Sequence, residues 1–334
     1  MRNIELGQLI KLKDYTTRYE QNIYHYPARF VALKKQQWNK LQKKWENPYE
    51  ELVSSYINLE IEEEQSETKN SIFGKIKMLF HRNHDNEIEN IDESHLMIPS
   101  TEDEELSNFE EILTSYHRPV TRDELKQQFL NKLFEFQMTW ATSTLVDKSF
   151  FNKKYYYDER LKYFLQRFPD TYLVLYHPVF KLKKATIEVE TILISPTEVW
   201  CITFVEEADL AVFIGNNQKF WSIRSQHKEK KVVNPLISLN RMGKIVKKIL
   251  EISDVELPIH KILLSRNGYI DYPTPPYDVK LVDKKNYDQW FRSLRELRSP
   301  LKAVQLKGAE ALLHFCHTES TRRIEWGVSD ISDE

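Results

Sequence analysis

The chain has 334 residues, enough for one sizeable hydrophobic core with appendages or for two domains. Its 48 Lys and Arg residues balance 50 Asp and Glu residues, which excludes a uniformly basic nucleic-acid-binding protein and restricts any such contact to a local patch. With 7 glycines and no G-x-G-x-x-G or G-K-[ST] segment, the sequence argues against a phosphate-binding loop.

No stretch of the sequence approaches the roughly 18 apolar residues of a membrane-spanning helix. The first residues contain no apolar segment of the kind found in a secretory leader. The two cysteines, Cys201 and Cys316, cannot form a metal cluster alone, and such scarcity of thiols is typical of a reduced compartment. The sequence therefore predicts a cytoplasmic protein without a transmembrane segment.

Residues 1–58 are predicted to form an N-terminal helical region that is locally basic. Tyr26 precedes Pro27 and should interrupt the helix, because a residue before proline avoids the helical conformation. Beyond that break, Trp38 and Trp45 recur at helical spacing while most of the lysines lie elsewhere. This helix either packs its tryptophan face on the main domain or offers that face to a protein partner, nucleic acid or a membrane surface.

Residues 59–116 form an acidic segment that is low in aromatic residues, and we predict a disordered insertion there. Within it, Phe73–Phe80 carries apolar residues at helical spacing beside basic ones. That short amphipathic helix either binds a partner or a membrane surface, or packs back on the domain.

Residues 117–149 are predicted to hold a connecting helix. Thr121 and Glu124 have the spacing of a capping box, in which each side chain bonds the other residue's backbone N–H. The helix that follows has one apolar face, which we expect to be buried and which consists of Leu125, Phe129, Leu133, Phe136 and Trp140.

Residues 150–316 are predicted to form an α/β domain. A helix is expected over 155–165, followed by a strand over 171–180 that Pro178 should place at a sheet edge or bulge. Residues 185–207 have the pattern of two strands joined by a tight turn at 195–197. The second of these strands is almost continuously apolar, as in a central strand that is buried on both faces.

The remainder of the domain is predicted to contain a hairpin, further strands and helices. The hairpin turns at Gly215, and a helix begins at Asn234-Pro235, where the asparagine can cap and the proline suits the first turn. This helix exposes Arg241, Lys244 and Lys248, which could follow nucleic-acid phosphates or form an ordinary solvated face. The last strands are expected over 257–265 and 277–283, the closing helices over 286–297 and 303–315, and a flexible tail over 317–334.

Several short motifs of this domain resemble the nuclease-related domain (NERD), a bacterial domain of the PD-(D/E)xK nuclease-like superfamily. Val189-Glu190 occupies the place of the family's Ile-Asp pair, and Ile194-Ser195-Pro196 matches the turn that follows it. Asn234-Pro235-Leu236 matches the family's Asn-Pro-Leu-x-Gln segment, with Ser238 in place of glutamine. The resemblance implies a restriction-endonuclease-like mixed central sheet flanked by helices, here with an added N-terminal helical region.

The same resemblance implies a nuclease site, and this sequence departs from it. Family members hold Mg²⁺ with two carboxylates and use the lysine of a Glu-x-Lys motif to position or deprotonate water. Here Thr203 and Val205 occupy the glutamate and lysine positions, while Glu190 and the first-helix Glu159 are candidate catalytic remnants. Three glutamates are alternative metal ligands, because Glu188 lies on the same strand face as Glu190, and Glu207 on the same face as Thr203. The ten histidines are scattered, with no pair at metal-ligand spacing.

Three functions follow from these observations. The first is a catalytically inactive or weakened nuclease-like module that binds or scaffolds, with DNA as the expected partner and no cofactor. The second is a DNA nuclease that depends on Mg²⁺ and uses a rearranged carboxylate site. The third is a protein that docks on a partner or membrane through Trp38, Trp45 or the Phe73–Phe80 helix.

Overall fold

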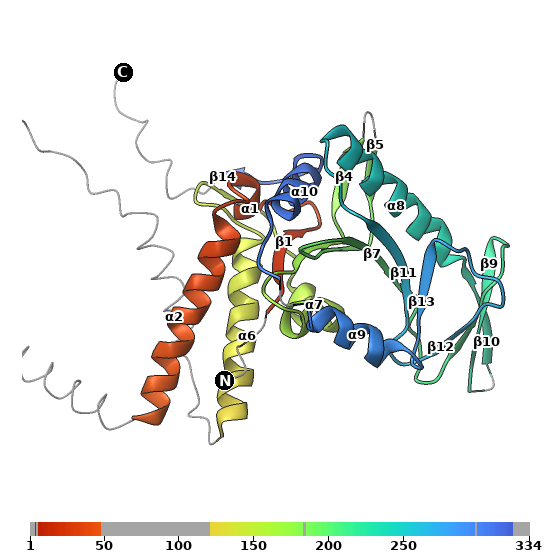
Figure 1. The fold of residues 1–334 in the computed structure, drawn as a ribbon, viewed down its shortest axis with the longest axis horizontal. Coiled ribbons are helices and arrows are strands. Elements are labelled where there is room, and N and C mark those ends of the chain that lie inside the picture. Colours follow the sequence, from red (N-terminus) through yellow and green to blue (C-terminus); the bar gives the residue numbers. More distant parts are fainter. Residues whose placement is uncertain are drawn as a thin grey trace, which may run out of the picture. The chain divides into compact units, whose positions relative to one another are not determined.

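The structure is a computed structural model that describes residues 4, 6–47, 121–182, 185–226, 228–297 and 299–322 (Figure 1). It divides into two compact units, one of Met1–Val31 with Ile112–Glu334 and one of Ala32–Glu111. The predicted insertion over 59–116, its Phe73–Phe80 helix and the tail beyond residue 322 lie outside the described residues. Within the described part, every helix is too short or too polar to cross a bilayer.

The N-terminal region begins with a strand, so the prediction of a purely helical region is wrong there. β1 (Gln8–Leu12) pairs in parallel with β3 (Leu173–Tyr176) and is buried throughout, because it is one strand of the central sheet. Two helices follow, α1 (Arg18–Gln21), capped by the Thr17 hydroxyl, and α2 (Tyr26–Glu46). Pro27 lies in the first turn of α2, where a missing N–H costs no helical hydrogen bond.

A mixed six-stranded sheet forms the centre of the first unit, as predicted for an α/β protein, in the order β1-β3-β6-β7-β11-β13. β3, β6 and β7 are antiparallel neighbours, whereas β7 pairs in parallel with β11 and β11 with β13. The later strands span Thr191–Ile194 (β6), Val199–Phe204 (β7), Ile259–Leu264 (β11) and Val279–Val282 (β13). β7 is central and almost wholly buried, which confirms the prediction from its apolar run.

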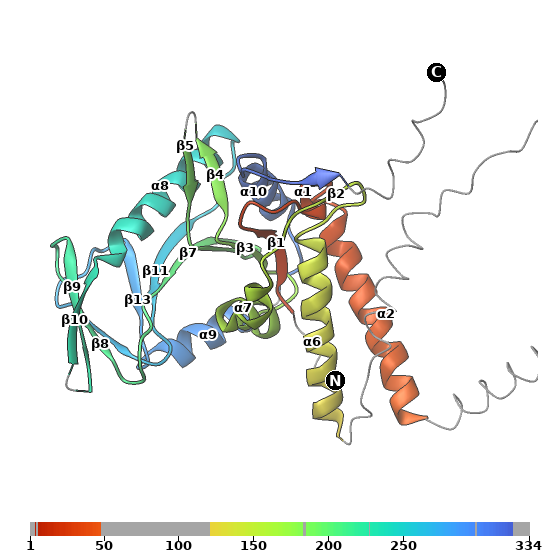
Figure 2. The same cartoon turned by 180° about the vertical axis from the view of Figure 1, so that it is seen from behind.

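Helices cover both faces of this sheet (Figures 1 and 2). On one side lie α8 (Pro235–Ile252), which contacts β7 and β11, and α10 (Ala303–His314), which contacts α8. On the other lie α7 (Glu159–Arg167) and α9 (Tyr287–Arg295), whose apolar side chains share one core cluster with β3, β7 and β11. α6 (Arg122–Trp140) contacts α7 and β1. Its capping box and all five predicted buried residues are confirmed.

The predicted helix over 155–165 starts later than expected. Residues Lys153–Tyr157 form a 3-10 turn (η1), and α7 begins at Glu159 because the Asp158 carboxylate accepts hydrogen bonds from the N–H groups of Arg160 and Leu161. Two very short strands, β2 (Asp147–Lys148) and β14 (Thr321–Arg322), pair with each other. The start of the predicted flexible tail is therefore held in place, because residues 321–322 join this small sheet.

The strand predicted over 185–194 is broken in two, and this break positions the candidate site. β4 (Val179–Leu182) and β5 (Ala185–Glu188) form a separate two-stranded sheet. His177, with φ 51°, turns the chain out of β3, and its N–H donates to the Glu190 carbonyl at 2.8 Å. Glu190 therefore marks the point where the chain re-enters the central sheet at β6.

A second sheet of four strands lies beside the first, in the order β10-β9-β8-β12. Its strands are β8 (Val212–Ile214), β9 (Phe220–Ser225), β10 (Lys228–Val233) and β12 (Tyr269–Asp271). Gly215 stands at the predicted turn because a Cβ there would lie 2.7 Å from the Tyr272 ring. Trp221 is fully buried and its indole N–H donates to the Asn216 carbonyl at 2.9 Å.

Candidate functional site

Glu190 is the centre of the candidate site, and three donors from two elements, β7 and α8, meet its carboxylate. The Thr203 hydroxyl of β7 donates to Oε1 at 3.0 Å, and the Ser238 hydroxyl of α8 donates to the same oxygen at 3.1 Å. The backbone N–H of Phe204 bonds the carboxylate as well. The structure thus brings together Glu190, Thr203 and Ser238, three residues at positions that the family resemblance singled out.

The environment of Glu190 favours its neutral form. Burial raises the pKa of this carboxyl, because a charge is poorly solvated at the edge of the core. Hydrogen bonds from Thr203, Ser238 and the Phe204 N–H act in the opposite direction, as does the charge of Arg160. Burial is the larger effect, so the pKa of Glu190 lies above its ordinary value.

A cavity of about 410 Å³ opens beside Glu190. Its wall joins the ends of β6 and β7 to the segment that links β10 to α8, and consists of Glu190, Thr203, Phe204, Val233, Asn234, Pro235, Ile237, Ser238 and Arg241. The wall therefore combines one carboxylate, two hydroxyls, one guanidinium and several apolar groups. Such a cavity can hold a small polar group beside an apolar one.

The Asn234 segment fixes the start of α8 beside this cavity, as the sequence predicted. The Asn234 side chain accepts from the Leu236 N–H at 3.0 Å and caps the helix. Its amide also donates to the Gln218 carbonyl at 2.8 Å, in the turn between β8 and β9. One side chain thereby holds the helix start, with Ser238 in its first turn, against the second sheet.

Arg160 is a site residue that sequence reasoning missed. Its guanidinium lies 5.0 Å from the centroid of the Phe204 ring, and its Nε is 3.4 Å from a carboxylate oxygen of Glu206. The neighbouring Glu159, the predicted catalytic acid, is exposed and lines another cavity, together with Arg266. With the apolar side of α7 facing the core, Arg160 and not Glu159 approaches the end of β7.

Sequence reasoning also missed Glu206, because the alternation of side chains along the strand pointed to its neighbour Glu207 as a metal ligand. β7 ends at Phe204, so alternation of faces does not extend to residues 206 and 207. Glu206 accepts two hydrogen bonds from the Arg266 guanidinium, at 2.6 and 2.9 Å. Burial raises the pKa of this carboxyl, but the hydrogen bonds and charge of Arg266 outweigh burial and hold it below its ordinary range.

The structure does not unite the carboxylates that were predicted to bind a metal. The Glu188 side chain is 51% exposed, and its carboxylate lies 3.5 Å from Nδ1 of His177. Glu207 forms an ion pair with Lys230 at 2.6 Å. In the described ranges, no group of three or more His, Cys, Asp or Glu side chains could hold a metal ion. Val205, at the lysine position of the resemblance, is buried and uncharged.

The predicted basic face of α8 is exposed, but its three residues differ in whether they lie beside the Glu190 cavity. Arg241 lines the Glu190 cavity, whereas Lys248 lies 3.7 Å from Glu251 on its own helix. Lys244 is exposed between them. Of the three candidate nucleic-acid-binding residues, Arg241 is therefore the one that shares a cavity with Glu190.

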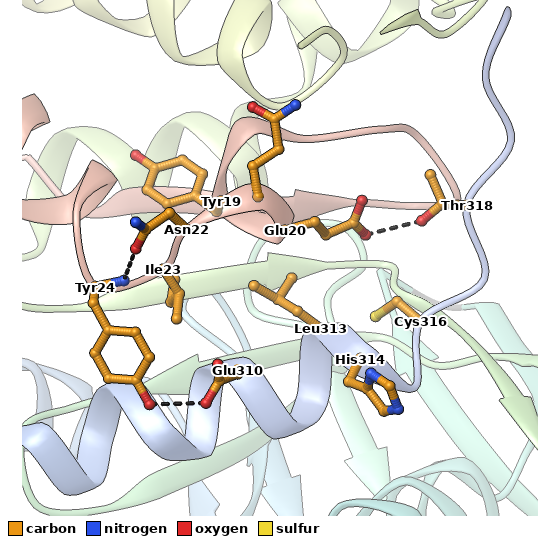
Figure 3. Close-up of a pocket in the computed structure, with 11 residues that line it drawn as sticks. Tyr19, Glu20, Asn22, Ile23, Tyr24, Glu310, Leu313, His314, Cys316 and Thr318 are labelled. Atoms are coloured by element: carbon orange, nitrogen blue, oxygen red, sulfur yellow. Dashed lines mark hydrogen bonds between the residues drawn. The ribbon is translucent and has the colours of Figure 1, made fainter.

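A larger cavity of about 600 Å³ lies between α1 and α10 (Figure 3). Four of its polar side chains are hydrogen-bonded to each other: Tyr24 donates to Glu310 at 2.8 Å, and Thr318 donates to Glu20 at 2.8 Å. The buried Lys11 also donates to Glu20, at 2.5 Å. Burial raises the pKa of the Cys316 thiol to about 12, so this cysteine is not a nucleophile at neutral pH. We assign this cavity a structural role.

Comparison with known proteins gives one short likeness. No family model matches the chain, and no solved structure matches it. A 41-residue segment is 49% identical to RNA 2',3'-cyclic phosphodiesterase of Geobacillus stearothermophilus. The match covers 12% of this chain and 13% of that protein, so the chain spans well under two thirds of its length. The resemblance to nuclease-related domains stays a prediction.

Proposed function

We propose that this chain is a nuclease-like module that binds a nucleic-acid phosphate in the Glu190 cavity without cleaving it. The observation that carries the proposal is the set of groups around Glu190. Thr203 and Ser238 supply neutral hydroxyls, and the arginines Arg160 and Arg241 supply the positive charge. Arginine suits a phosphate because its planar guanidinium can form two parallel hydrogen bonds to phosphate oxygens.

A resident magnesium ion fits these residues poorly. Mg²⁺ requires oxygen ligands at near-octahedral geometry and is commonly held by carboxylates. Among the residues that the structure describes, Glu190 is the one carboxylate that lines the cavity, and one of its oxygens already accepts two hydroxyl hydrogen bonds. The charge of Arg160 acts on the same carboxylate and would oppose a second cation.

The raised pKa of Glu190 is compatible with an anionic ligand. A protonated carboxyl donates a hydrogen bond and carries no charge that would repel a phosphate. A bound phosphate should raise this pKa further, because it favours the protonated form.

Binding is tested with labelled single-stranded DNA, duplex DNA and single-stranded RNA, with fluorescence anisotropy as the measurement. The short match to an RNA phosphodiesterase is the reason for including RNA. Arg241→Ala should weaken binding about tenfold, because a charge-assisted hydrogen bond is lost. It should also reduce the slope of log affinity against log salt concentration by about 0.9, the value for one phosphate contact on a duplex. Arg292→Ala, at an exposed arginine of α9, is the matched control and should change neither quantity.

The alternative function is a nuclease that depends on a divalent metal. Linear, nicked and single-stranded DNA are incubated with the protein and Mg²⁺ or Mn²⁺. The proposal predicts intact DNA in every sample. Cleavage that Glu190→Ala abolishes would overturn it and establish the nuclease.

A further inference from the structure

A small apolar surface adjoins the Glu190 cavity and is named here the apolar rim. It consists of Phe220, Val233 and Ile237, whose exposed fractions are 48%, 59% and 51%. Phe220 and Val233 are directly paired neighbours on β9 and β10, and Val233 and Ile237 both line the cavity that contains Glu190. The rim therefore continues the cavity wall onto the outer surface of the second sheet.

Exposed positive charges surround the apolar rim. The Lys219 ammonium lies 5.6 Å from the centroid of the Phe220 ring. Lys231 precedes Val233 by two residues on β10 and therefore shares its face of the sheet. Arg241 follows Ile237 by about one helical turn and lines the cavity. Two acidic groups belong to the same part of the structure: Glu190 lines the cavity, and Glu229 precedes Lys231 by two residues on the same face of β10.

We propose that the apolar rim stacks against an unpaired base and that the ligand is single-stranded nucleic acid. This inference rests on the proposed function, in which the cavity holds a backbone phosphate. Positive charges beside an aromatic ring match an anionic chain that carries flat apolar groups. In a duplex each base is paired and stacked within the helix, so its face cannot reach a ring beside the phosphate site. A single strand can place a phosphate in the cavity and lay the adjacent base on Phe220.

The experiment uses the full chain with a short fluorescein-labelled oligothymidylate and with a duplex of equal length. Single-stranded DNA should bind more tightly than duplex. Phe220→Ala should weaken its binding by about tenfold or more, the usual effect of removing one stacking ring. Phe220→Trp should retain binding, because the larger ring still stacks, and its added indole fluorescence should be quenched by the oligonucleotide. Phe150→Ala, at a phenylalanine that is 90% exposed outside the rim, is the matched control and should leave binding unchanged.

The possible outcomes separate this inference from the proposed function. If no nucleic acid binds, both are overturned. If duplex and single strand bind equally and Phe220→Ala has no effect, the stacking site is refuted while phosphate binding stands. If Phe220→Ala reduces binding to vesicles of anionic lipid but not to oligothymidylate, the rim is a membrane contact and the inference is wrong.

Discussion

Thr203→Val tests whether the central hydrogen bond of the site stabilises the charged form of Glu190. Thr203 is 3% exposed, and valine preserves its shape while removing the hydroxyl that donates at 3.0 Å. A hydrogen bond to a charged group contributes about 1.5–3 kcal/mol, against about 0.5–1.5 kcal/mol for a neutral one. We therefore expect the free energy of unfolding to fall by about 2 kcal/mol where Glu190 is ionised and by about 1 kcal/mol where it is protonated.

The assay is urea denaturation over a series of pH values. Because burial holds the pKa of Glu190 above its ordinary value of 4.5, the native state keeps a proton that the unfolded state has released. Stability attributable to this group is therefore highest below pH 4.5 and falls as the pH rises toward the pKa of the folded state. Thr203→Val removes a donor that lowers this pKa, so the fall should be larger and extend to higher pH.

Two controls accompany this measurement. Thr186→Val makes the same change at an exposed position of β5 and should alter the free energy of unfolding by less than about 0.5 kcal/mol. A carbon NMR titration of the glutamate carboxyls reads the pKa of Glu190 directly. The hydroxyl does not stabilise the carboxylate if Thr203→Val lowers the free energy of unfolding by the same amount at every pH. The same conclusion follows if the pKa of Glu190 does not rise in the variant.

Two further predictions concern the ion pairs. Lys11→Met should lower the free energy of unfolding by about 1–3 kcal/mol, because Glu20 loses a charge-assisted hydrogen bond but is 22% exposed and keeps its hydrogen bond from Thr318. Adding Glu20→Gln should recover part of that loss in urea denaturation, and a loss below about 1 kcal/mol for the single change would contradict the buried pair. Arg266 holds the pKa of Glu206 low, so the contribution of this pair is present at neutral pH and lost as the pH falls through the folded-state value. Glu206→Gln should therefore lower the melting temperature at neutral pH and reduce its decline as the pH falls. If the melting temperatures of the variant and the original protein fall in parallel with pH, the ion pair does not contribute as proposed.

Local patterns predicted those parts of the fold that depend on neighbouring residues. The capping box of Thr121 and Glu124 and the buried face of α6 follow from helical spacing. The Asn234 cap and the central position of β7 could also be predicted, because each depends on residues that are close together in the sequence. The pairing of β6 with β7 across a short turn also brought Glu190 beside Thr203, as the motif order implied.

The missed features depend on distant parts of the chain or on small rotations. β1 was assigned to a helical region because its partner β3 is remote in sequence, and pairing at that distance leaves no local pattern. Arg160 was overlooked because the resemblance pointed to its neighbour Glu159, which projects about 100° away around α7. Glu206 was overlooked because β7 ends two residues earlier, so the rule of alternating faces no longer applies.

The place of β1 also has consequences for how the polypeptide folds during synthesis. β1 leaves the ribosome before β3, because Leu173, the neighbour of Gln8, lies much later in the chain. Closing a loop costs only about 0.6 kcal/mol more than closing a loop of half its length. The long separation of β1 and β3 therefore delays their pairing during synthesis but has little effect on the stability of the folded protein. Until β3 emerges, β1 has unpaired N–H and C=O groups that can pair with another nascent chain. A fragment that begins at residue 150 would lack β1 and leave the edge of β3 unpaired permanently, and self-association is its expected fate.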